Sequence, residues 1–326
     1  MRCLHGQSGP GKNRVLFLSH THWESEFVVG SHHLARELSL DGWDVLRMVT
    51  PLSLMHTVLR RSDTGNSLGR WMNRIETDID RSGVTNVRVS TILPAQVSGR
   101  YGRSVLSRLG FEDPRFIIVD QPLMLDRWVF TTGATVIYRP TDLYLGSDAK
   151  RKEAQWLPLV DGLVATSGAV LDGLKSVFPL HSLPTSVIPN GVDLRTFSGG
   201  ADLGEDRDGV IYVGSLDHRF DWEFLMGVAR ELEDVLFRIA GPVRDVPDLP
   251  ANIIVMGAVA YGDVPALMRT ASVAIMPLSC ADENRGRSPM KLYEFLASGL
   301  PVVSTDVLAG IPSSLGEAYF EAHSAD

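Results

Sequence analysis

The sequence predicts an α/β fold built from two doubly wound domains. Short β-branched runs alternate with helix-length amphipathic segments along the whole chain, the pattern of βαβ units with parallel sheets. The 326 residues suffice for two domains. Hydrophobic residues make up 44% of the chain and charged residues 21%. This composition provides enough apolar side chains for packed cores and excludes a largely disordered protein.

In the first half of the chain, β-branched runs predict a series of strands separated by helices. In the segment between the first two strands, Leu34, Ala35 and Leu38 form the apolar stripe of a helix, and Gly42 ends that helix. The strands are expected at Arg14–Ser19, Asp44–Val49, Asn86–Leu93, Phe116–Asp120, Ala134–Arg139, Gly162–Thr166 and Ser186–Pro189.

A segment rich in Pro, Asn, Gly and Asp follows Ile188 and predicts a linker. We therefore expect a disordered tail over residues 1–13, a first Rossmann-like domain over 14–197 and a second over 198–326. Because doubly wound sheets bind ligands beyond the carboxyl ends of their strands, the site is expected in a cleft between the two domains. The strands of the second domain are expected at Gly209–Val213, Leu236–Ala240, Asn252–Met256, Val273–Met276 and Pro301–Ser304.

Charge and cysteine content exclude several classes of protein. A net charge of −8 argues against a dedicated nucleic-acid binder. Between His56 and Gly110, however, nine arginines oppose four acids, so this stretch either faces phosphates or anionic lipid or is a solvated surface. The two cysteines, the lack of a secretory leader and the lack of an 18-residue apolar run predict a cytoplasmic chain, soluble or peripheral on a membrane.

The most informative segment is SPMKLYEFLASGLPVVSTD, from Ser288 to Asp306. Ser288 is a good N-cap and Gly299 a good stop, so a helix should run between them. The amides of a helix start, together with Lys291 in the first turn, suit a phosphate group. Glu294 lies three residues further on the same face, where a carboxylate can bind two ribose hydroxyls. The alternative is an ordinary capped surface helix with a Lys/Glu pair.

With this segment, three others resemble the GT-B glycosyltransferases, which transfer a sugar from a nucleotide donor. They are IPNGVD from Ile188 to Asp193, the glycine at Gly214, and RIAGP from Arg238 to Pro242. The likeness covers nearly the whole chain and points to the bacterial group that builds exopolysaccharides and glycolipids. SPMKLYEF is similar to the branch containing the xanthan glucuronosyltransferase and teichuronic-acid transferases. Because family members usually continue with helices, the chain ending at Asp326 is expected to be truncated.

The resemblance implies a nucleotide-sugar site in the second domain, with Glu294 matching the ribose-binding glutamate. Where family members carry a second glutamate, this chain has Gly286, and Ser215 and Phe220 stand in place of two phosphate-binding cations. Other residues must then supply the positive charge. Tyr261 either stacks on the base or is a loop aromatic. The expected donor-binding residues are Gly214, Arg219, Tyr261, Arg285, Arg287, Ser288, Met290, Lys291 and Glu294.

In the first domain, SHTHWESEFVVGSHH directly follows the first strand. Gly30 stands where GT-B enzymes bring a loop and a helix start against donor phosphate or acceptor. His20 and His22 lack the further ligands that a metal site needs, so acceptor binding by His20, His22, Glu24 and Gly30 is the better interpretation, and no metal or other cofactor is expected. The pattern is not GxGxxG, which disfavours dinucleotide oxidoreduction.

Asp142 in YRPTDLY comes three residues after a buried strand, in the loop region where such sheets keep their chemistry. A carboxylate there can accept the proton of the attacking acceptor hydroxyl, and the resemblance to the glucuronosyltransferase branch points to the same residue as base. The alternative role is a turn or N-cap aspartate, and Asp120 is the substitute base. Asp142 and Lys291 are the expected catalytic residues, with Lys291 meeting the leaving-group charge.

Taken together, these patterns predict a glycosyltransferase with a UDP-linked hexose or glucuronate donor and a saccharide or lipid-linked acceptor. It would act in cell-surface polysaccharide or glycolipid synthesis, on the inner face of the plasma membrane if the basic stretch binds anionic lipid. Two alternatives stay open from the sequence. One is a nucleotide-sugar epimerase of the same fold, and the other is a non-catalytic subunit that binds a sugar nucleotide.

Overall fold

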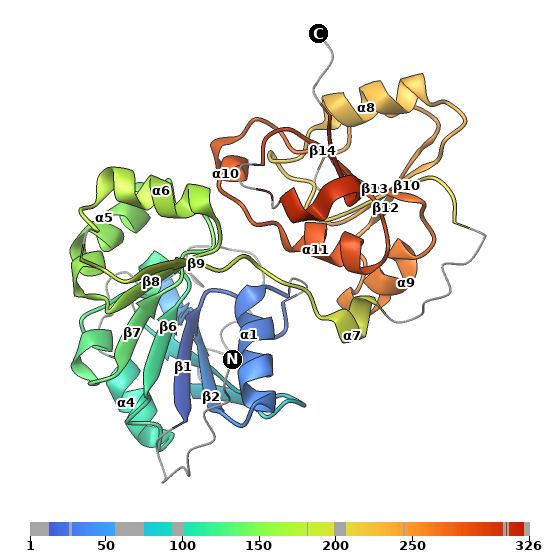
Figure 1. Cartoon of the computed structure of the whole chain (residues 1–326). Helices are drawn as coiled ribbons and strands as arrows, with labels where there is room; N and C mark the ends of the chain where they lie inside the picture. Colours follow the sequence, from blue (N-terminus) through green and yellow to red (C-terminus); the bar gives the residue numbers. More distant parts are fainter. Residues whose placement is uncertain are drawn as a thin grey trace. The chain divides into compact units, whose positions relative to one another are not determined.

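The structure, a computed structural model, describes residues 13–25, 28–55, 75–92, 101–180, 182–198, 207–243, 245–308, 311 and 313–322 (Figure 1). They form two compact units, Met1–Ala165 with Leu174–Val187, and Thr166–Gly173 with Ile188–Asp326. Each unit contains a largely or wholly parallel sheet with helices packed on it. The predicted α/β fold with two doubly wound, Rossmann-like domains is confirmed.

The sheet of the first unit has the order β3-β5-β2-β1-β6-β7-β8-β9. β1 runs parallel to both β2 and β6, so the chain reverses its direction of winding between β1 and β6. Ligands of doubly wound folds bind at such a reversal. The strands are β1 (Arg14–Ser19), β2 (Asp44–Val49), β3 (Leu52–Ser53), β4 (Ile75–Ile79), β5 (Thr85–Thr91), β6 (Phe116–Val119), β7 (Thr135–Tyr138), β8 (Gly162–Ala165) and β9 (Thr185–Val187).

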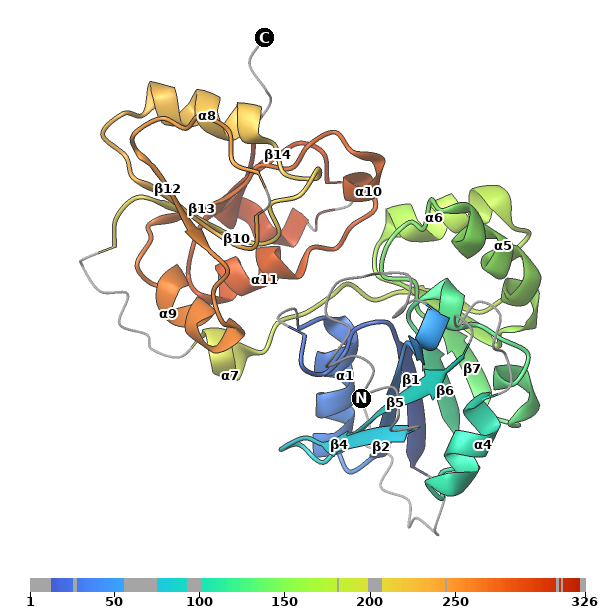
Figure 2. The ribbon, with the colours of Figure 1, turned by 180° about the vertical axis from the view of Figure 1, so that it is seen from behind.

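β4 was not predicted from the sequence. It pairs antiparallel with β5, beside which it lies in Figure 2. Its sequence IETDI is half-buried at its start and exposed from Thr77 to Ile79. An edge strand that buries so little has no apolar alternation to reveal it. Its charged residues instead suit an edge that must not pair with other chains.

Helix α1 (Gly30–Leu40) packs Ala35 and Leu38 against Val15 and Phe17 of β1. The predicted apolar stripe is wrong at Leu34, which is 37% exposed. Gly42 has φ +86° and follows the helix end, as predicted. The other helical segments up to β9 are α4 (Tyr101–Arg108), η1 (Pro122–Met124), η2 (Val129–Thr131), α5 (Ser147–Trp156), η3 (Leu157–Leu159) and α6 (Gly168–Val177).

The second unit has an all-parallel sheet in the order β12-β11-β10-β13-β14-β15. The winding reverses between β10 and β13, as in a dinucleotide-binding fold. β15 was not predicted, because YFEA is too short and too exposed to show a strand pattern. The strands are β10 (Val210–Val213), β11 (Phe237–Ala240), β12 (Ile253–Gly257), β13 (Val273–Met276), β14 (Val302–Thr305) and β15 (Tyr319–Ala322).

Helices cover both faces of this second sheet, with α8 on one side and α9 and α11 on the other (Figure 1). The alternation of β10 explains this: Val210 and Tyr212 pack with α8, whereas Ile211 and Val213 pack with α9 and α11. The helical segments are α7 (Leu194–Phe197), α8 (Trp222–Glu231), η4 (Tyr261–Asp263), α9 (Val264–Met268), α10 (Asp282–Arg285), α11 (Met290–Ala297) and η5 (Ser313–Ala318).

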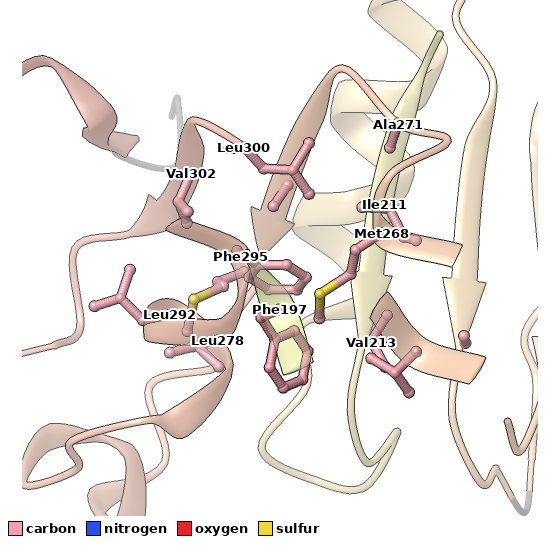
Figure 3. Close-up of a cluster of buried hydrophobic side chains, with 14 of the residues drawn as sticks. Phe197, Ile211, Val213, Met268, Ala271, Leu278, Leu292, Phe295, Leu300 and Val302 are labelled. Carbon is pink, nitrogen blue, oxygen red and sulfur yellow. The ribbon is translucent and has the colours of Figure 1, made fainter. Parts of the chain in front are cut away.

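Figure 3 shows the larger core cluster of the second unit, with the rings of Phe197 and Phe295 close to the side chain of Met268. Phe197 belongs to α7, which directly follows the IPNGVD segment. Its fully buried ring therefore anchors that segment to the second unit.

Several expectations lie outside the described residues. They include the tail over residues 1–12 and five of the nine arginines of the basic stretch, in 56–74 and 93–100. The helices expected after residue 326 lie beyond the sequence itself. In the described part of the chain, no helix combines the length and the apolar character needed to cross a bilayer.

Candidate functional site

Close backbone packing shapes the carboxyl end of the second sheet. Gly214 follows β10 and Gly241 follows β11, and a Cβ atom on Gly241 would lie 1.6 Å from the carbonyl oxygen of Gly214. A Cβ atom on Gly214 would in turn lie 2.5 Å from the Tyr212 hydroxyl. Only glycine fits at Gly241, where the clash is with backbone, and any larger residue at Gly214 would have to displace the Tyr212 hydroxyl.

The start of α11 differs from the expectation in one respect. Pro289, not Ser288, is the N-cap, and it makes no side-chain cap. The Ser288 hydroxyl instead accepts a hydrogen bond from the Asn190 backbone N–H (3.1 Å), and the Asn190 side chain donates to the Ser288 carbonyl (2.7 Å). The IPNGVD segment thus holds the chain that leads into α11. At the other end, Gly299 has φ +73° and ends the helix, as predicted.

Lys291, Glu294 and Tyr261 form a cluster on the first turns of α11. The Glu294 side chain is only 2% exposed, and its Oε2 accepts a hydrogen bond from Lys291 Nζ at 2.5 Å. Tyr261 donates to Oε1 at 3.4 Å, and Lys291 Nζ lies 5.6 Å from the centre of the Tyr261 ring. The structure therefore brings together three of the predicted donor-binding residues. Both carboxylate oxygens of Glu294 are already bound by protein groups.

The arginines expected near the phosphates have different surroundings. Arg219 forms a two-pronged ion pair with Asp217, at 2.9 Å from Nε and 2.5 Å from Nη2. Partial burial acts to raise the pKa of Asp217, but the hydrogen bonds and charge of Arg219 outweigh it and hold that pKa well below its usual range. Arg285 is exposed and lies 3.8 Å from Asp282. The pairing of Arg219 with Asp217 was not predicted, although Asp217 lies only two residues before Arg219 in the sequence.

Arg287 is half-buried beside Tyr212, at the end of β10. Burial raises the pKa of Tyr212 to about 12, and the positive charge of Arg287 opposes that rise. Arg287 therefore lies near enough to Tyr212 of β10 to act on its ionisation. Asn284, fully buried two residues before Gly286, fixes the preceding loop by donating to the carbonyls of Arg219 and Ser279, both at 2.9 Å.

In the first unit, the predicted acceptor residues line the connection from β1 to α1. His20 and Glu24 are exposed, whereas His22 is half-buried and stacks on Trp23 with 3.8 Å between ring centres. The Glu24 backbone N–H donates to His22 Nδ1 at 3.1 Å. Gly30 is the first residue of α1. Among the described residues, no group of three His, Cys, Asp or Glu side chains could hold a metal ion.

A buried arginine and a half-buried histidine hold this connection, and no pattern in the sequence revealed this role for either. Arg47 of β2 is 1% exposed; its Nη1 donates to the Thr21 carbonyl (3.0 Å) and its Nε to Asn86 Oδ1 (2.8 Å). His32 Nδ1 accepts from the Val29 N–H (3.1 Å), and the ring also hydrogen-bonds to the His22 backbone.

Asp120 directly follows β6, at the reversal of winding, and is 2% exposed. Burial raises the pKa of its carboxyl group, while the positive charges of His20 and Arg139 and hydrogen bonds from Ser31 and Ser19 act against the rise. The Ser19 and Ser31 hydroxyls lie 2.8 Å apart beside it. The substitute base of the sequence analysis therefore belongs to a buried polar cluster.

Asp142 is half-buried and linked to that cluster through side chains. Its Oδ2 accepts from the Thr141 hydroxyl (3.2 Å), which lies 3.1 Å from the Tyr144 hydroxyl. Tyr144 donates to the Asp120 carbonyl at 2.8 Å. Thr141 and Tyr144 thus lie between the two candidate bases and each can donate to one of them, and Asp142 is the more exposed of the two.

The stability of the folded protein at acid pH should depend on the lowered pKa of His32. Burial and the guanidinium of Arg47 lower its pKa to about 3 from 6.5. Between these values the unfolded chain binds a proton that the folded protein excludes, so the free energy of unfolding falls as pH drops from 6.5 towards 3. Urea denaturation of the parent and of His32→Gln at several pH values measures this. We expect the variant to lose less stability over this interval, and equal losses would contradict the assignment.

Comparisons with known proteins agree with the fold and with the motifs. Residues 207–325 match the sequence model of the family "Glycosyl transferases group 1". Over 135 residues the chain is 28% identical to TuaH of Bacillus subtilis (strain 168), whose name assigns it to teichuronic acid biosynthesis as a glycosyltransferase. That alignment covers 37% of this chain and 34% of TuaH, so it spans about a third of the relative.

Solved structures extend the likeness over the whole fold. The structure of Anabaena HepE in complex with UDP and glucose has a TM-score of 0.60 at 15% identity, covering 95% of this chain and 85% of that one. A glycosyltransferase from Rickettsia africae has a TM-score of 0.64 at 12% identity, covering 97% and 85%. Two Rossmann-like domains of this kind make up the GT-B fold. The chain therefore has the GT-B fold, and its residues 207–325 are similar to the group 1 glycosyl transferases, in agreement with the resemblance seen in the sequence.

Proposed function

We propose that this chain transfers a sugar from a UDP-linked donor to a saccharide or lipid-linked acceptor in the synthesis of cell-surface polysaccharide or glycolipid. The cluster of Lys291, Glu294 and Tyr261 at the start of α11 is the observation that carries the proposal. Its place supports the proposal because α11 begins on the carboxyl side of the sheet, between β13 and β14. The UDP named for HepE, and the UDP-2-fluoro glucose named for the E. coli trehalose-6-phosphate structure, support the choice of nucleotide.

In the proposed complex, the donor diphosphate lies at the start of α11. The backbone amides of the first turn and the charge of Lys291 face its oxygens, and Arg287 adds a second cation near the end of β10. Gly214 allows the backbone close to the phosphates. Glu294 accepts from the ribose hydroxyls at the lone pairs that Lys291 and Tyr261 leave on its oxygens. The positive charge comes from side chains and needs no metal. The sugar is a hexose or glucuronate, and Arg285 and Arg287 would suit a uronate carboxylate.

The reaction then needs a base on the acceptor side. We assign it to Asp142, which is accessible and fixed by Thr141. The acceptor hydroxyl gives its proton to the carboxylate as its oxygen attacks the anomeric carbon, and the bond to the UDP oxygen breaks. Lys291 and the helix start stabilise the charge that develops on the diphosphate. His20, His22, Glu24 and Gly30 bind the acceptor.

Replacing the base should abolish transfer without removing donor binding. Asp142→Asn keeps the shape of the side chain and is expected to lower kcat by about 100-fold or more while leaving the Kd for UDP unchanged. Radiolabelled UDP-hexoses and UDP-glucuronate, with octyl glucoside as acceptor, measure transfer, and calorimetry measures UDP binding. Asp120→Asn is the matched comparison.

Full transfer by Asp142→Asn with loss in Asp120→Asn would move the base to Asp120. Isomerised donor in the absence of acceptor would instead identify an epimerase. UDP binding with no conversion of any donor by the parent would favour a non-catalytic binding subunit.

The membrane part of the proposal has a separate test. The excess of arginine between His56 and Gly110 is expected to attract anionic headgroups at about 1 kcal/mol per basic residue near the surface. The protein should therefore sediment with vesicles containing 30 mol% phosphatidylglycerol, and 0.5 M NaCl should release it. Equal sedimentation with purely zwitterionic vesicles would show that these arginines do not direct the protein to the membrane.

A further inference from the structure

We propose that Arg47 and His32 are positioning residues for the transfer reaction, which fix the β1–α1 connection so that His20, His22 and Glu24 meet the acceptor. The inference rests on the proposed function for the role of that connection. The positioning itself rests on contacts in the first unit alone.

Arg47 supports the connection from β2, the neighbour of β1 in the sheet. Its guanidinium holds the Thr21 carbonyl, two residues beyond the end of β1, while Asn86 on β5 fixes the other side of the same group. Three adjacent strands, β1, β2 and β5, therefore determine where residue 21 lies. A backbone placed from a buried sheet in this way cannot shift without breaking hydrogen bonds that water does not replace.

The chemistry of Arg47 argues that it does more than stabilise the fold. Among the described residues its Nη2 has no hydrogen-bond partner, although it is buried. Burial lowers the pKa of Arg47 to about 10, against the attraction of Asp120 and Asp80, so the group stays charged at neutral pH. An apolar side chain at this position would leave both the Asn86 side-chain oxygen and the Thr21 carbonyl without their donor. An apolar side chain cannot donate the hydrogen bond that fixes the Thr21 carbonyl.

His32 holds the connection from its other end. It lies in the first turn of α1, where its Nδ1 accepts from the Val29 N–H at the N-cap and its backbone N–H donates to the Val29 carbonyl (2.9 Å). A neutral imidazole has one acceptor nitrogen and one donor nitrogen. Because Nδ1 of His32 is the acceptor, the other ring nitrogen of His32 donates the hydrogen bond to the His22 backbone. One ring thus ties the beginning of the connection to its end. The groups facing it are Arg47, His22 and His33.

Together the two side chains fix the backbone at Thr21, His22 and Val29. Of the residues expected to bind the acceptor, His22 and Glu24 lie at or between these points, and His20 and Gly30 lie directly beside them. His22 Nδ1 in turn accepts from the Glu24 N–H, so the placement reaches Glu24 as well. Loss of either side chain should therefore loosen the acceptor side of the site, while the nucleotide residues of the second unit keep their contacts.

The test compares Arg47→Met and His32→Leu with Lys152→Met. Lys152 is also a buried cation that donates to a backbone carbonyl of the first unit, that of Leu125, but it does not touch the connection. Amide hydrogen exchange in the intact protein, followed by mass spectrometry, measures how firmly the backbone of the connection is held. We expect peptides covering residues 20–32 to exchange at least 10-fold faster in the first two variants and unchanged in Lys152→Met. Unchanged exchange in Arg47→Met and His32→Leu would overturn the proposal.

Kinetics on octyl glucoside then separate positioning from general damage. A displacement of about 1 Å can cost on the order of 100-fold in rate, so we expect kcat/KM for the acceptor to fall by that order in both variants. The Kd for UDP should stay within twofold of the parent, and His32→Gln should recover part of the rate. An equal loss in Lys152→Met, or an unchanged kcat/KM in Arg47→Met, would overturn the proposal. If the parent transfers no sugar, the proposed function fails while the exchange experiment still decides whether Arg47 and His32 hold the connection.

Discussion

Gly241→Ala should prevent the second unit from folding. The new methyl carbon would lie 1.6 Å from the Gly214 carbonyl oxygen, and the backbone at Gly241 has φ +155°. Because the clash is with backbone at the ends of two central strands, no side chain can move to relieve it. We expect a loss of about 4 kcal/mol or more in the free energy of unfolding, or insoluble protein, as measured by urea denaturation.

Gly227→Ala is the matched control for this substitution. Gly227 lies inside α8, and a Cβ atom there would meet nothing within 4 Å. Alanine should stabilise this helix by about 0.5 to 1 kcal/mol. A Gly241→Ala protein as stable as the parent would contradict the described packing of β10 against β11.

Lys291→Ala should lower sugar transfer by about 100- to 1000-fold, the usual cost of removing a group that stabilises charge in the transition state. The same variant should weaken UDP binding, because the first turn of α11 then lacks its cation. Calorimetry with UDP and initial rates with a UDP-sugar and octyl glucoside measure the two effects.

Tyr261→Phe controls for the packing of the cluster. It removes one hydrogen bond of 3.4 Å to Glu294 but keeps the ring beneath Lys291, so its effect on UDP binding should be small. A Lys291→Ala protein that binds UDP and transfers sugar as the parent does would move the donor site away from α11.

The sequence predicted those elements whose apolar residues form a clear run between turn residues. The strands β1, β2 and β13 have the predicted bounds, because each is a nearly continuous apolar run between clear turn residues. The short or polar strands β3, β4 and β15 were missed, since strands that bury so little give no pattern to read. The end of α11 was correct because Gly299 acts locally.

The site was predictable where spacing decides the contact. Lys291 and Glu294 are three residues apart on one helix, and the structure pairs them. Ser288 was expected to cap that helix, but its hydroxyl meets Asn190, 98 residues earlier in the chain, which no local pattern reveals. Arg47 was invisible for a related reason: nothing in DVLRMV shows that its arginine lies inside the first unit and holds residue 21.

The burial of Glu294 has a consequence for work in concentrated salt. At 0.1 M ionic strength, dissolved ions screen the attraction between exposed charges that are more than about 10 Å apart. They do not enter the space between a carboxylate that is 2% exposed and the ammonium group 2.5 Å away. Raising the salt concentration should therefore screen whatever anion approaches the first turn of α11 long before it separates Lys291 from Glu294. Crystals grown from molar salt would show this pair intact.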